Sequence, residues 1–349
     1  MTQRVGVHQY RDNKFFATLR RGRAKGKRGV DRLGSHGANG AQPEMLRLIN
    51  NPPPWPNGAR CAVCFSFDFD AESLLHLYYP EDSRRRISVS STLRYGARVA
   101  VPRIVEIWKH FGVKQTMFVP GWCVETYPKA IELLLRDGHE IAHHGWLHER
   151  PNQLSRQDEE RVLKKGVEII AAVTGKPVAG YRCPSGAYSE YTLDLLIDNG
   201  FLYDASLGGD DIPYLIEGSN GRRLVELPSD HSLDDWPQYV NMREFNMGIP
   251  TKSPAQAMEV FRADFDAAWR HGGLWAAIWH PFVSGRLARA EAMVTLFEHM
   301  REKGGVWFAT LAEIGAYVQG LVDRGEWTPP VERIPFWQEP VPQVARPSR

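Results

Sequence analysis

Short apolar runs alternate with longer segments of helical periodicity from residue 62 onward. The apolar runs have the length of strands and cover residues 62–69, 114–119, 139–143, 178–182, 201–204, 224–227, 274–280 and 306–309. Helix start signals stand between several of them, at Ser155 with Asp158, at Ser253-Pro254, and at Thr310 with Glu313. Strands and helices that alternate in this way predict parallel β/α units.

The number of these repeats favours a closed barrel. The alternation occurs about eight times over about 260 residues, which is a usual size for an α/β barrel. An open doubly wound sheet would more often carry a glycine-rich phosphate-binding turn after its first strand, and no such turn follows residue 69. We therefore expect an α/β fold built on a distorted barrel of about seven to eight strands.

The two ends of the chain differ from this central region. Residues 1–44 hold ten Lys or Arg side chains against three acidic ones and lack hydrophobic periodicity, so we expect a disordered basic leader. Such a leader can bind nucleic acid, but a solvated segment is the preferred interpretation, and nucleic acid is not an expected partner. Residues 45–325 are expected to form the catalytic domain. The proline-rich residues 326–349 are expected to form an irregular extension that packs on the domain or on another subunit.

Apolar patterning also bears on the compartment. The chain has no run of about 18 apolar residues, and charges stand where the apolar part of a secretory signal should lie. We therefore expect a soluble, cytoplasmic protein without a membrane partner. Cys61 and Cys64 have the C-x-x-C spacing of a zinc knuckle or redox pair, but no second Cys/His pair with finger spacing follows, which favours two core residues.

The apolar run at residues 65–70 ends with two carboxylates on one side of a strand. Residues i and i+2 of a strand share a face, so Asp68 and Asp70 point to the same side while Phe67 and Phe69 pack on the other. Two buried like charges repel each other. The pair therefore requires a cation or a proton.

A group of histidines supplies candidate partners for such a cation. His144 and His148 are four residues apart across a glycine-containing turn, and two imidazoles with one carboxylate form the donor set of an open catalytic metal site. His139 and His143 have the same spacing, so spacing alone leaves the choice open. Position favours His144 and His148, because they follow the carboxyl end of the predicted strand, where barrel sites form.

Other unusual polar residues also follow predicted strand ends. Arg182 begins the sequence Arg-Cys-Pro-Ser-Gly after the fourth strand, Asp204 follows the fifth, and His280 follows the seventh. Because the carboxyl ends of parallel barrel strands meet at one face, we expect these side chains to converge on the carboxylate pair.

Together these motifs resemble the polysaccharide deacetylase family, carbohydrate esterase 4-like proteins with a NodB-homology domain, from Ala62 to Tyr317. Residues 67–70 are similar to the family's first motif, although adjacent aspartates are commoner there. Residues 144–148 match His-x-x-x-His, and residues 182–186 match Arg-x-Pro-x-Gly. Four features resemble an intracellular branch that contains peptidoglycan-deacetylase-like proteins, cyclic imide hydrolases and allantoinase-like proteins: the Asp-x-Asp form and residues 210–214, 224–228 and 279–281.

The resemblance implies a fold and a role for each site residue. The fold would be the NodB-type distorted barrel. One divalent metal, with Zn²⁺ expected and Mn²⁺ or Co²⁺ as alternatives, would be bound by Asp70, His144 and His148. Asp68 would be the general base that deprotonates the attacking water, and Arg182 would keep it ionised. His280 would be the general acid that protonates the leaving nitrogen.

Further residues receive less specific roles. A backbone N–H near Tyr188 is expected to contact the oxyanion, and Asp204 to orient His280. Asp211 is expected to line the pocket, with a solvated acidic turn as an equal alternative. The aromatic residues 236–245 could form a sugar platform or a lid, but core or interface packing is favoured.

The expected activity is metal-dependent hydrolysis of a non-peptide C–N bond, with an N-acetylated saccharide as substrate. A small cytosolic imide or ureide of the allantoin or hydantoin type is the alternative, and a catalytically inactive binding module is the non-enzymatic one. A shallow groove lined by aromatic residues would indicate an oligosaccharide. An enclosed pocket, narrowed by a neighbouring subunit or by residues 72–95, would indicate a small cyclic substrate. We expect a homo-oligomer.

Overall fold

The computed structural model describes residues 46–340 except Ile249 and Gln338. The predicted leader, residues 1–44, lies outside the described residues. Among the described helices, none combines the length and the apolar character needed to cross a membrane.

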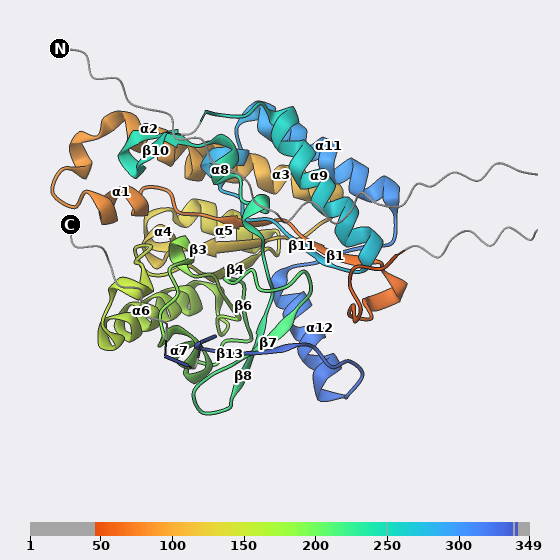
Figure 1. Cartoon of the computed structure of the whole chain (residues 1–349). Coiled ribbons are helices and arrows are strands. Elements are labelled where there is room, and N and C mark those ends of the chain that lie inside the picture. Colours follow the sequence, from red (N-terminus) through yellow and green to blue (C-terminus); the bar gives the residue numbers. More distant parts are fainter. Residues whose placement is uncertain (1–45, 249, 338, 341–349) are drawn as a thin grey trace, which may run out of the picture. The chain divides into compact units, whose positions relative to one another are not determined.

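Two mainly parallel sheets organise the fold (Figure 1). Their strands are, in chain order, β1 (Cys61–Cys64), β2 (Ser66–Asp68), β3 (Thr116–Val119), β4 (Glu140–His143), β5 (Gly180–Tyr181), β6 (Tyr203–Asp204), β7 (Tyr214–Glu217), β8 (Arg223–Glu226), β11 (Leu274–Ala276), β12 (Val306–Phe308) and β13 (Val331–Arg333). One sheet has eight strands in the order β13-β7-β8-β6-β5-β4-β3-β2, and another has three in the order β11-β1-β12. An isolated bridge between Phe67 and Trp279 connects the two sheets beside the end of β2. The predicted α/β fold with a distorted barrel is confirmed.

The first predicted strand, residues 62–69, is divided at Phe65. β1 pairs with β11 on one side and β12 on the other, whereas β2 pairs with β3. The end of β2 is held on both sides, because the Asp68 N–H donates to the Trp279 carbonyl at 2.7 Å and the Phe69 N–H to the Phe118 carbonyl at 2.8 Å. The carboxylate pair therefore starts from a fixed backbone.

Two strands of the eight-stranded sheet, β7 and β13, were not predicted. β7 pairs antiparallel with β8, and β13 pairs parallel with β7. The expectation that residues 326–349 are irregular is thus wrong for Val331–Arg333. The side chains of β13 are exposed and only its backbone is engaged, so no apolar pattern marks this strand in the sequence.

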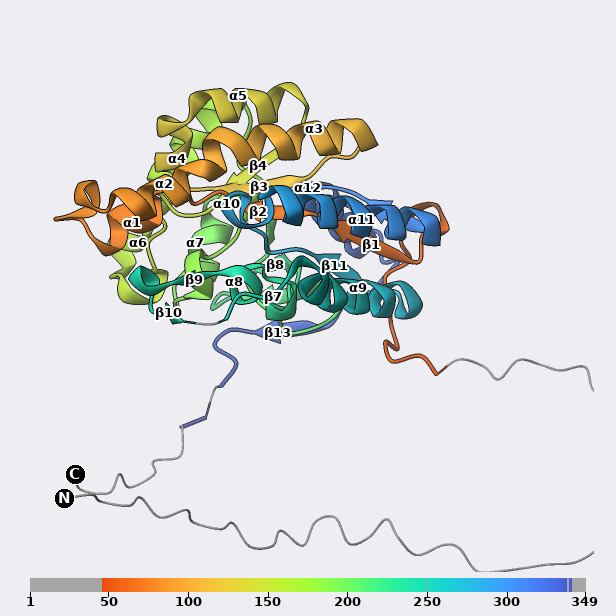
Figure 2. The same cartoon turned by 90° about the horizontal axis from the view of Figure 1, so that it is seen from above.

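Helices surround the strands (Figures 1 and 2). They are α1 (Ser73–Tyr78), α2 (Ile87–Tyr95), α3 (Val101–Phe111), α4 (Gly121–Thr126), α5 (Pro128–Arg136), α6 (Arg156–Thr174), α7 (Thr192–Asp198), α8 (Trp236–Tyr239), α9 (Pro254–His271), α10 (Pro281–Ser284), α11 (Leu287–Lys303) and α12 (Leu311–Asp323). The predicted caps are present: the Ser155 hydroxyl accepts the Asp158 N–H, and full capping boxes begin α9 and α12. A separate short hairpin joins β9 (Asn241–Met242) to β10 (Met247–Gly248).

Strand β1 divides the core into two clusters. Cys61 and Val63 pack in one cluster, and Ala62 and Cys64 in the other, because successive side chains of a strand point to opposite faces. Both cysteines are fully buried and carry free thiols. Their interpretation as core residues is therefore confirmed.

Candidate metal and hydrolytic site

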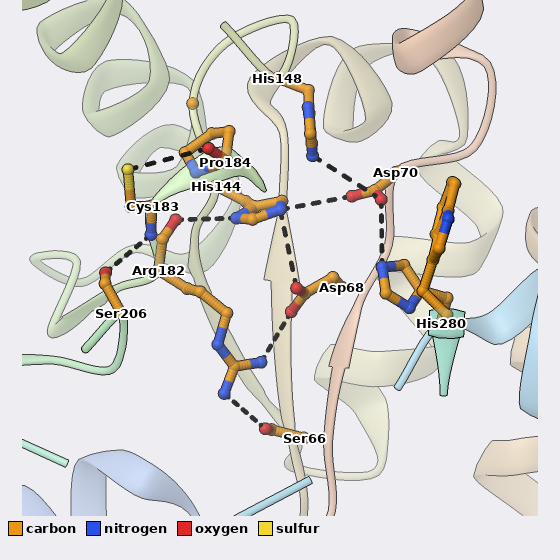
Figure 3. A network of polar contacts seen from close by, with 12 residues as sticks. Ser66, Asp68, Asp70, His144, His148, Arg182, Cys183, Pro184, Ser206 and His280 are labelled. Atoms are coloured by element: carbon orange, nitrogen blue, oxygen red, sulfur yellow. Dashed lines mark hydrogen bonds and ion pairs between the residues drawn. The ribbon is translucent and has the colours of Figure 1, made fainter. Parts of the chain in front are cut away.

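The polar residues at the carboxyl ends of the strands converge in one place (Figure 3). Asp68 is the last residue of β2 and Asp70 lies two residues beyond it, His144 follows β4, and Arg182 follows β5. His280 lies shortly after β11 and is the N-cap residue of α10. As expected, the parallel arrangement brings these separate segments to one face of the barrel.

A tight turn after β4 places the two histidines. Gly145 has φ 75° and His148 has φ 65°, a left-handed conformation that is uncommon for a residue with a side chain. The Glu149 carboxylate fixes the turn by accepting the N–H groups of Trp146 at 3.0 Å and Leu147 at 2.9 Å. Local strain of this kind, held by a dedicated partner, is typical of functional positions.

Asp70, His144 and His148 present their donor atoms to a common point. The three donors lie within 4.8 Å of one another. His144 Nε2 is 3.5 Å from one Asp70 oxygen, and His148 Nε2 is 3.8 Å from the other. Two ligands of a tetrahedral Zn²⁺, each at about 2.1 Å, are about 3.4 Å apart. The spacing suits a metal rather than direct hydrogen bonds.

The surroundings of the three donors fit a cation as well. Asp70 is 1% exposed, and its Oδ1 atom has no hydrogen-bond partner among the described residues. Burial raises the pKa of Asp70, and the Asp68 charge adds to this shift. His144 Nδ1 donates to the Arg182 carbonyl at 2.7 Å, which leaves the lone pair of Nε2 directed at Asp70. The residues present therefore fit one divalent metal.

Asp68 has different partners from Asp70. Arg182 donates from Nη1 to Asp68 Oδ1 at 2.7 Å, and from Nη2 to the Ser66 hydroxyl at 2.9 Å. Its Nε donates to the Ala205 carbonyl at 3.0 Å. Burial opposes ionisation of Asp68, but the Arg182 charge, with a smaller contribution from His280, lowers the pKa of this carboxyl. Asp68 is consequently held as a carboxylate beside the donor triad.

His280 lies on the other side of Asp70 and is held by Asp235. Its Nε2 is 3.5 Å from Asp70 Oδ2, and its Nδ1 is 2.7 Å from Asp235 Oδ1. Asp235 Oδ2 accepts the His280 N–H at 3.0 Å and the Ser284 hydroxyl at 2.5 Å. Burial disfavours the charged ring, but Asp235 raises the pKa of His280 to about 10. The ring is therefore prepared to donate a proton.

The structure places Asp235, not Asp204, against His280, so the role expected for Asp204 is wrong. Asp204 is buried in β6 and accepts the Ala205 N–H at 2.8 Å. Asp235 was missed because it lies in an irregular segment, where the Asp235 N–H donates to the Ile278 carbonyl at 3.1 Å. The sequence feature that could have indicated Asp235 is the adjacent pair Asp234-Asp235 before an aromatic segment.

Two other expected residues also lie away from the reacting groups. The Tyr188 N–H donates to the Gly186 carbonyl at 3.0 Å, so it is not free to contact an oxyanion. Asp211 is exposed and does not line the cavity; its carbonyl accepts the Leu274 N–H at 3.0 Å. The alternative interpretation of Asp211, a solvated acidic turn, describes its position.

The competing histidine pair is structural. His143 is fully buried, and burial lowers the pKa of its ring to about 3. Its Nε2 donates to the Leu163 carbonyl at 3.1 Å while its Nδ1 accepts the Gly145 N–H at 3.1 Å. The buried His139 ring accepts the Gln115 N–H at 3.3 Å. Neither ring belongs to the donor triad.

A cavity of about 340 Å³ opens over the converging residues. Besides the triad, Asp68, Arg182 and His280, it is lined by residues from α1, the loop after His148, and residues 229–245. Trp236 and Phe245 from the predicted aromatic segment belong to this wall, with ring centroids 5.9 Å apart. A volume of this size accommodates one sugar unit or a small cyclic molecule.

Comparison with known proteins identifies the class. The family model for polysaccharide deacetylases matches residues 81–203. A peptidoglycan deacetylase of Helicobacter pylori is 30% identical over 72% of this chain and 94% of its own length. A peptidoglycan deacetylase-like protein of Gibberella zeae is 28% identical over 79% of this chain and 84% of its own length. The chain belongs to the polysaccharide deacetylase family.

Solved structures agree with this assignment. A crystal structure from Mycobacterium smegmatis, assigned to the polysaccharide deacetylases, is 36% identical and covers 87% of this chain and 100% of its own, with a TM-score of 0.75. The PuuE allantoinase structure has a TM-score of 0.68 at 22% identity, over 86% of this chain and 100% of its own. The second likeness concerns the fold alone.

Proposed function

We propose that this protein is a divalent-metal-dependent hydrolase that cleaves a non-peptide C–N bond of an N-acylated substrate. The observation that carries the proposal is the arrangement around Asp70: a donor triad on one side, an ionised carboxylate paired with Arg182 on a second, and a protonated histidine on a third. A binding module has no need for a base and an acid on opposite sides of a metal site.

The residues divide the proton transfers between them. Asp68 accepts a proton from the attacking water, and Arg182 keeps Asp68 ionised until that step. The water oxygen bonds to the acyl carbon, and His280 donates its proton to the nitrogen as the C–N bond breaks. The products are a carboxylic acid and an amine. A metal held by Asp70, His144 and His148 would lower the pKa of the water towards about 7 and polarise the acyl carbonyl.

The cavity constrains the substrate. Its volume of about 340 Å³ and its wall of Tyr78, Phe245 and Trp236 suit one N-acetylated sugar unit at the reacting position. The family and the Helicobacter pylori relative support N-acetyl removal as the first choice. A small cyclic imide or ureide in the cytoplasm is the second choice, because the same volume accommodates such a ring without a saccharide chain.

A hydrolysis screen tests the proposal. The purified protein, supplied with Zn²⁺, Mn²⁺ or Co²⁺, is incubated with N-acetyl chitooligosaccharides, hydantoins, succinimide-type imides and allantoin. Acetate and free amine are quantified for the N-acetyl substrates, and the ring-opened carboxylic acid is quantified for the cyclic substrates. We expect turnover of at least one class, lost in His144→Gln and retained in His139→Gln, a buried histidine of the same segment. Absence of turnover on all substrates with all three metals would refute the proposal.

A further inference from the structure

Arg150 is a second arginine at the cavity, and the mechanism does not use it. It is half-buried, lines the cavity together with Tyr78, and follows His148 by two residues. Its Nη2 donates to the Tyr78 hydroxyl, and its guanidinium carbon lies 5.1 Å from the centre of the Tyr78 ring. Its Nε is buried and has no hydrogen-bond partner among the described residues.

No carboxylate of the described chain forms an ion pair with Arg150, although the other charged groups of the site are paired. Arg182 is bound to Asp68 at 2.7 Å, and His280 to Asp235 at 2.7 Å. Glu149, the neighbour of Arg150, accepts two backbone N–H groups of its own turn with Oε2. The Arg150 charge is therefore available to a molecule in the cavity.

A continuous series of ring contacts links Arg150 to the general acid. Tyr78 contacts Phe245 with ring centroids 5.6 Å apart, and Phe245 contacts Trp236 at 5.9 Å. Trp236 in turn contacts the His280 ring at 5.1 Å. A substrate lying against this wall would place one end at the reacting groups and the other at Arg150.

We propose that Arg150 binds a carboxylate of the substrate, so that the enzyme acts on N-acylated molecules that carry a carboxylate away from the scissile bond. The identity of the scissile bond rests on the function proposed above, whereas the carboxylate site does not. A planar monoanion matches a single guanidinium, which offers two parallel N–H groups. A phosphate dianion would keep one charge without an arginine partner here, because Arg182, the other arginine of the described lining, is paired with Asp68.

Two kinds of molecule carry both an N-acyl group and a carboxylate, and pairs of charged and neutral probes distinguish them. One is a saccharide unit that bears a carboxylate, represented by N-acetylmuramic acid with its methyl ester as the neutral partner. The other is a small N-acyl amino acid, represented by N-acetylglycine, N-acetyl-β-alanine and N-acetyl-4-aminobutyrate, each with its carboxamide. The second series also varies the distance between the charge and the acyl group.

Binding is measured by calorimetric titration of the Zn²⁺-loaded Asp68→Asn protein, which removes turnover from the readout. We expect at least one acid to bind about tenfold or more tightly than its neutral partner, as a charge-assisted bidentate contact provides. Arg150→Gln in the same background should remove that preference and leave the neutral partner unchanged. The matched control is Arg161→Gln, which replaces an exposed arginine of α6. It should change neither the preference for the acid nor the affinity for the neutral partner.

The outcomes distinguish the proposal of a carboxylate site from the proposal of hydrolase activity. Equal binding of every pair, or no binding of any acid, overturns the inference. A preference that persists in Arg150→Gln also overturns it, because the carboxylate is then bound elsewhere, for example by the metal. Should Arg150→Gln fail to fold, Tyr78→Phe, which removes the hydroxyl that holds the guanidinium, must reduce the preference. Wild-type hydrolysis without the preference refutes this inference alone, and the preference without hydrolysis refutes the proposed function alone.

Discussion

Asp68 and Asp70 are two residues apart, yet the structure gives them unlike surroundings. Asp68 is bound to Arg182 and its pKa is lowered, whereas burial raises the pKa of Asp70, which faces two imidazoles. The first arrangement suits a base and the second a metal ligand. Sequence alone predicted that the pair needs a cation, and the family resemblance divided the roles in the way that the contacts support.

Replacement of the base should separate binding of the metal from turnover. In Asp68→Asn the amide cannot accept the proton of water, while the donor triad is unchanged. We expect kcat to fall by about 10²- to 10⁴-fold, with the metal content measured by atomic spectroscopy unaltered. Wild-type turnover in this variant would show that another group is the base.

The partner of His280 gives a second prediction. Asp235→Asn removes the charge that holds the ring protonated, and kcat should fall by about 100-fold, the lower end of what a general acid contributes. Asp234→Asn is the matched control, because Asp234 is 3.9 Å from His280 Nδ1 and does not bind its backbone. Steady-state kinetics should show a larger loss of kcat for Asp235→Asn than for Asp234→Asn. Equal losses would contradict the assignment of Asp235 as the positioning residue.

At the scale of elements, strands β6 and β8 bring a carboxyl pair together in the core. Asp204 and Glu226 are directly opposite in the ladder, and both are fully buried. Ser206 and Leu207 donate their N–H groups to Glu226 at 3.0 and 2.9 Å. The two carboxyl groups hydrogen-bond to each other, which fits one shared proton, and the Tyr188 hydroxyl also contacts Asp204.

This pair predicts how stability changes with pH. Burial raises the pKa of Asp204 to about 6 and that of Glu226 well above its ordinary value. Above about pH 4 the unfolded chain has released protons that the folded chain retains, so the free energy of unfolding should fall as the pH rises. Glu226→Gln should reduce this fall and be more stable than wild type at pH 8 by about 1 kcal/mol.

Urea unfolding at pH 5 and pH 8 measures the effect. Glu217→Gln, which alters a surface carboxylate paired with Arg223 on the neighbouring strand, serves as the control and should leave the pH dependence unchanged. If the free energy of unfolding of Glu226→Gln changed between pH 5 and pH 8 as much as that of wild type, Glu226 would be ionised in the folded protein.

Helix α6 packs on the histidine strand through a glycine. A Cβ atom at Gly166 would be 2.2 Å from His143 Nε2. Glycine to alanine usually stabilises a helix by about 1 kcal/mol, but Gly166→Ala should instead destabilise the protein by about 1 to 3 kcal/mol through overpacking. Lys164→Ala on the exposed side of the same helix should change the unfolding free energy by less than about 0.5 kcal/mol. A stabilised Gly166→Ala protein would contradict this packing.

For the whole molecule, apolar periodicity was sufficient to predict the parallel strands other than β13 and the face at which the site forms. It could not predict β13, whose exposed side chains contribute no pattern, or the antiparallel β7, which follows directly on Pro213. The same limit applied to Asp235 and Arg150. Their positions depend on how irregular segments fold over the barrel, and irregular segments have no period to interpret.

The central claim is that the barrel holds one catalytic divalent metal at Asp70, His144 and His148. The most direct test is the amount of Zn²⁺ bound per chain after equilibration and removal of free metal, in wild type, His148→Gln and His139→Gln. The account predicts about one Zn²⁺ per chain in wild type and in His139→Gln, and a large loss in His148→Gln. Wild-type protein without bound Zn²⁺, or a His148→Gln protein that binds as much as wild type, would contradict it.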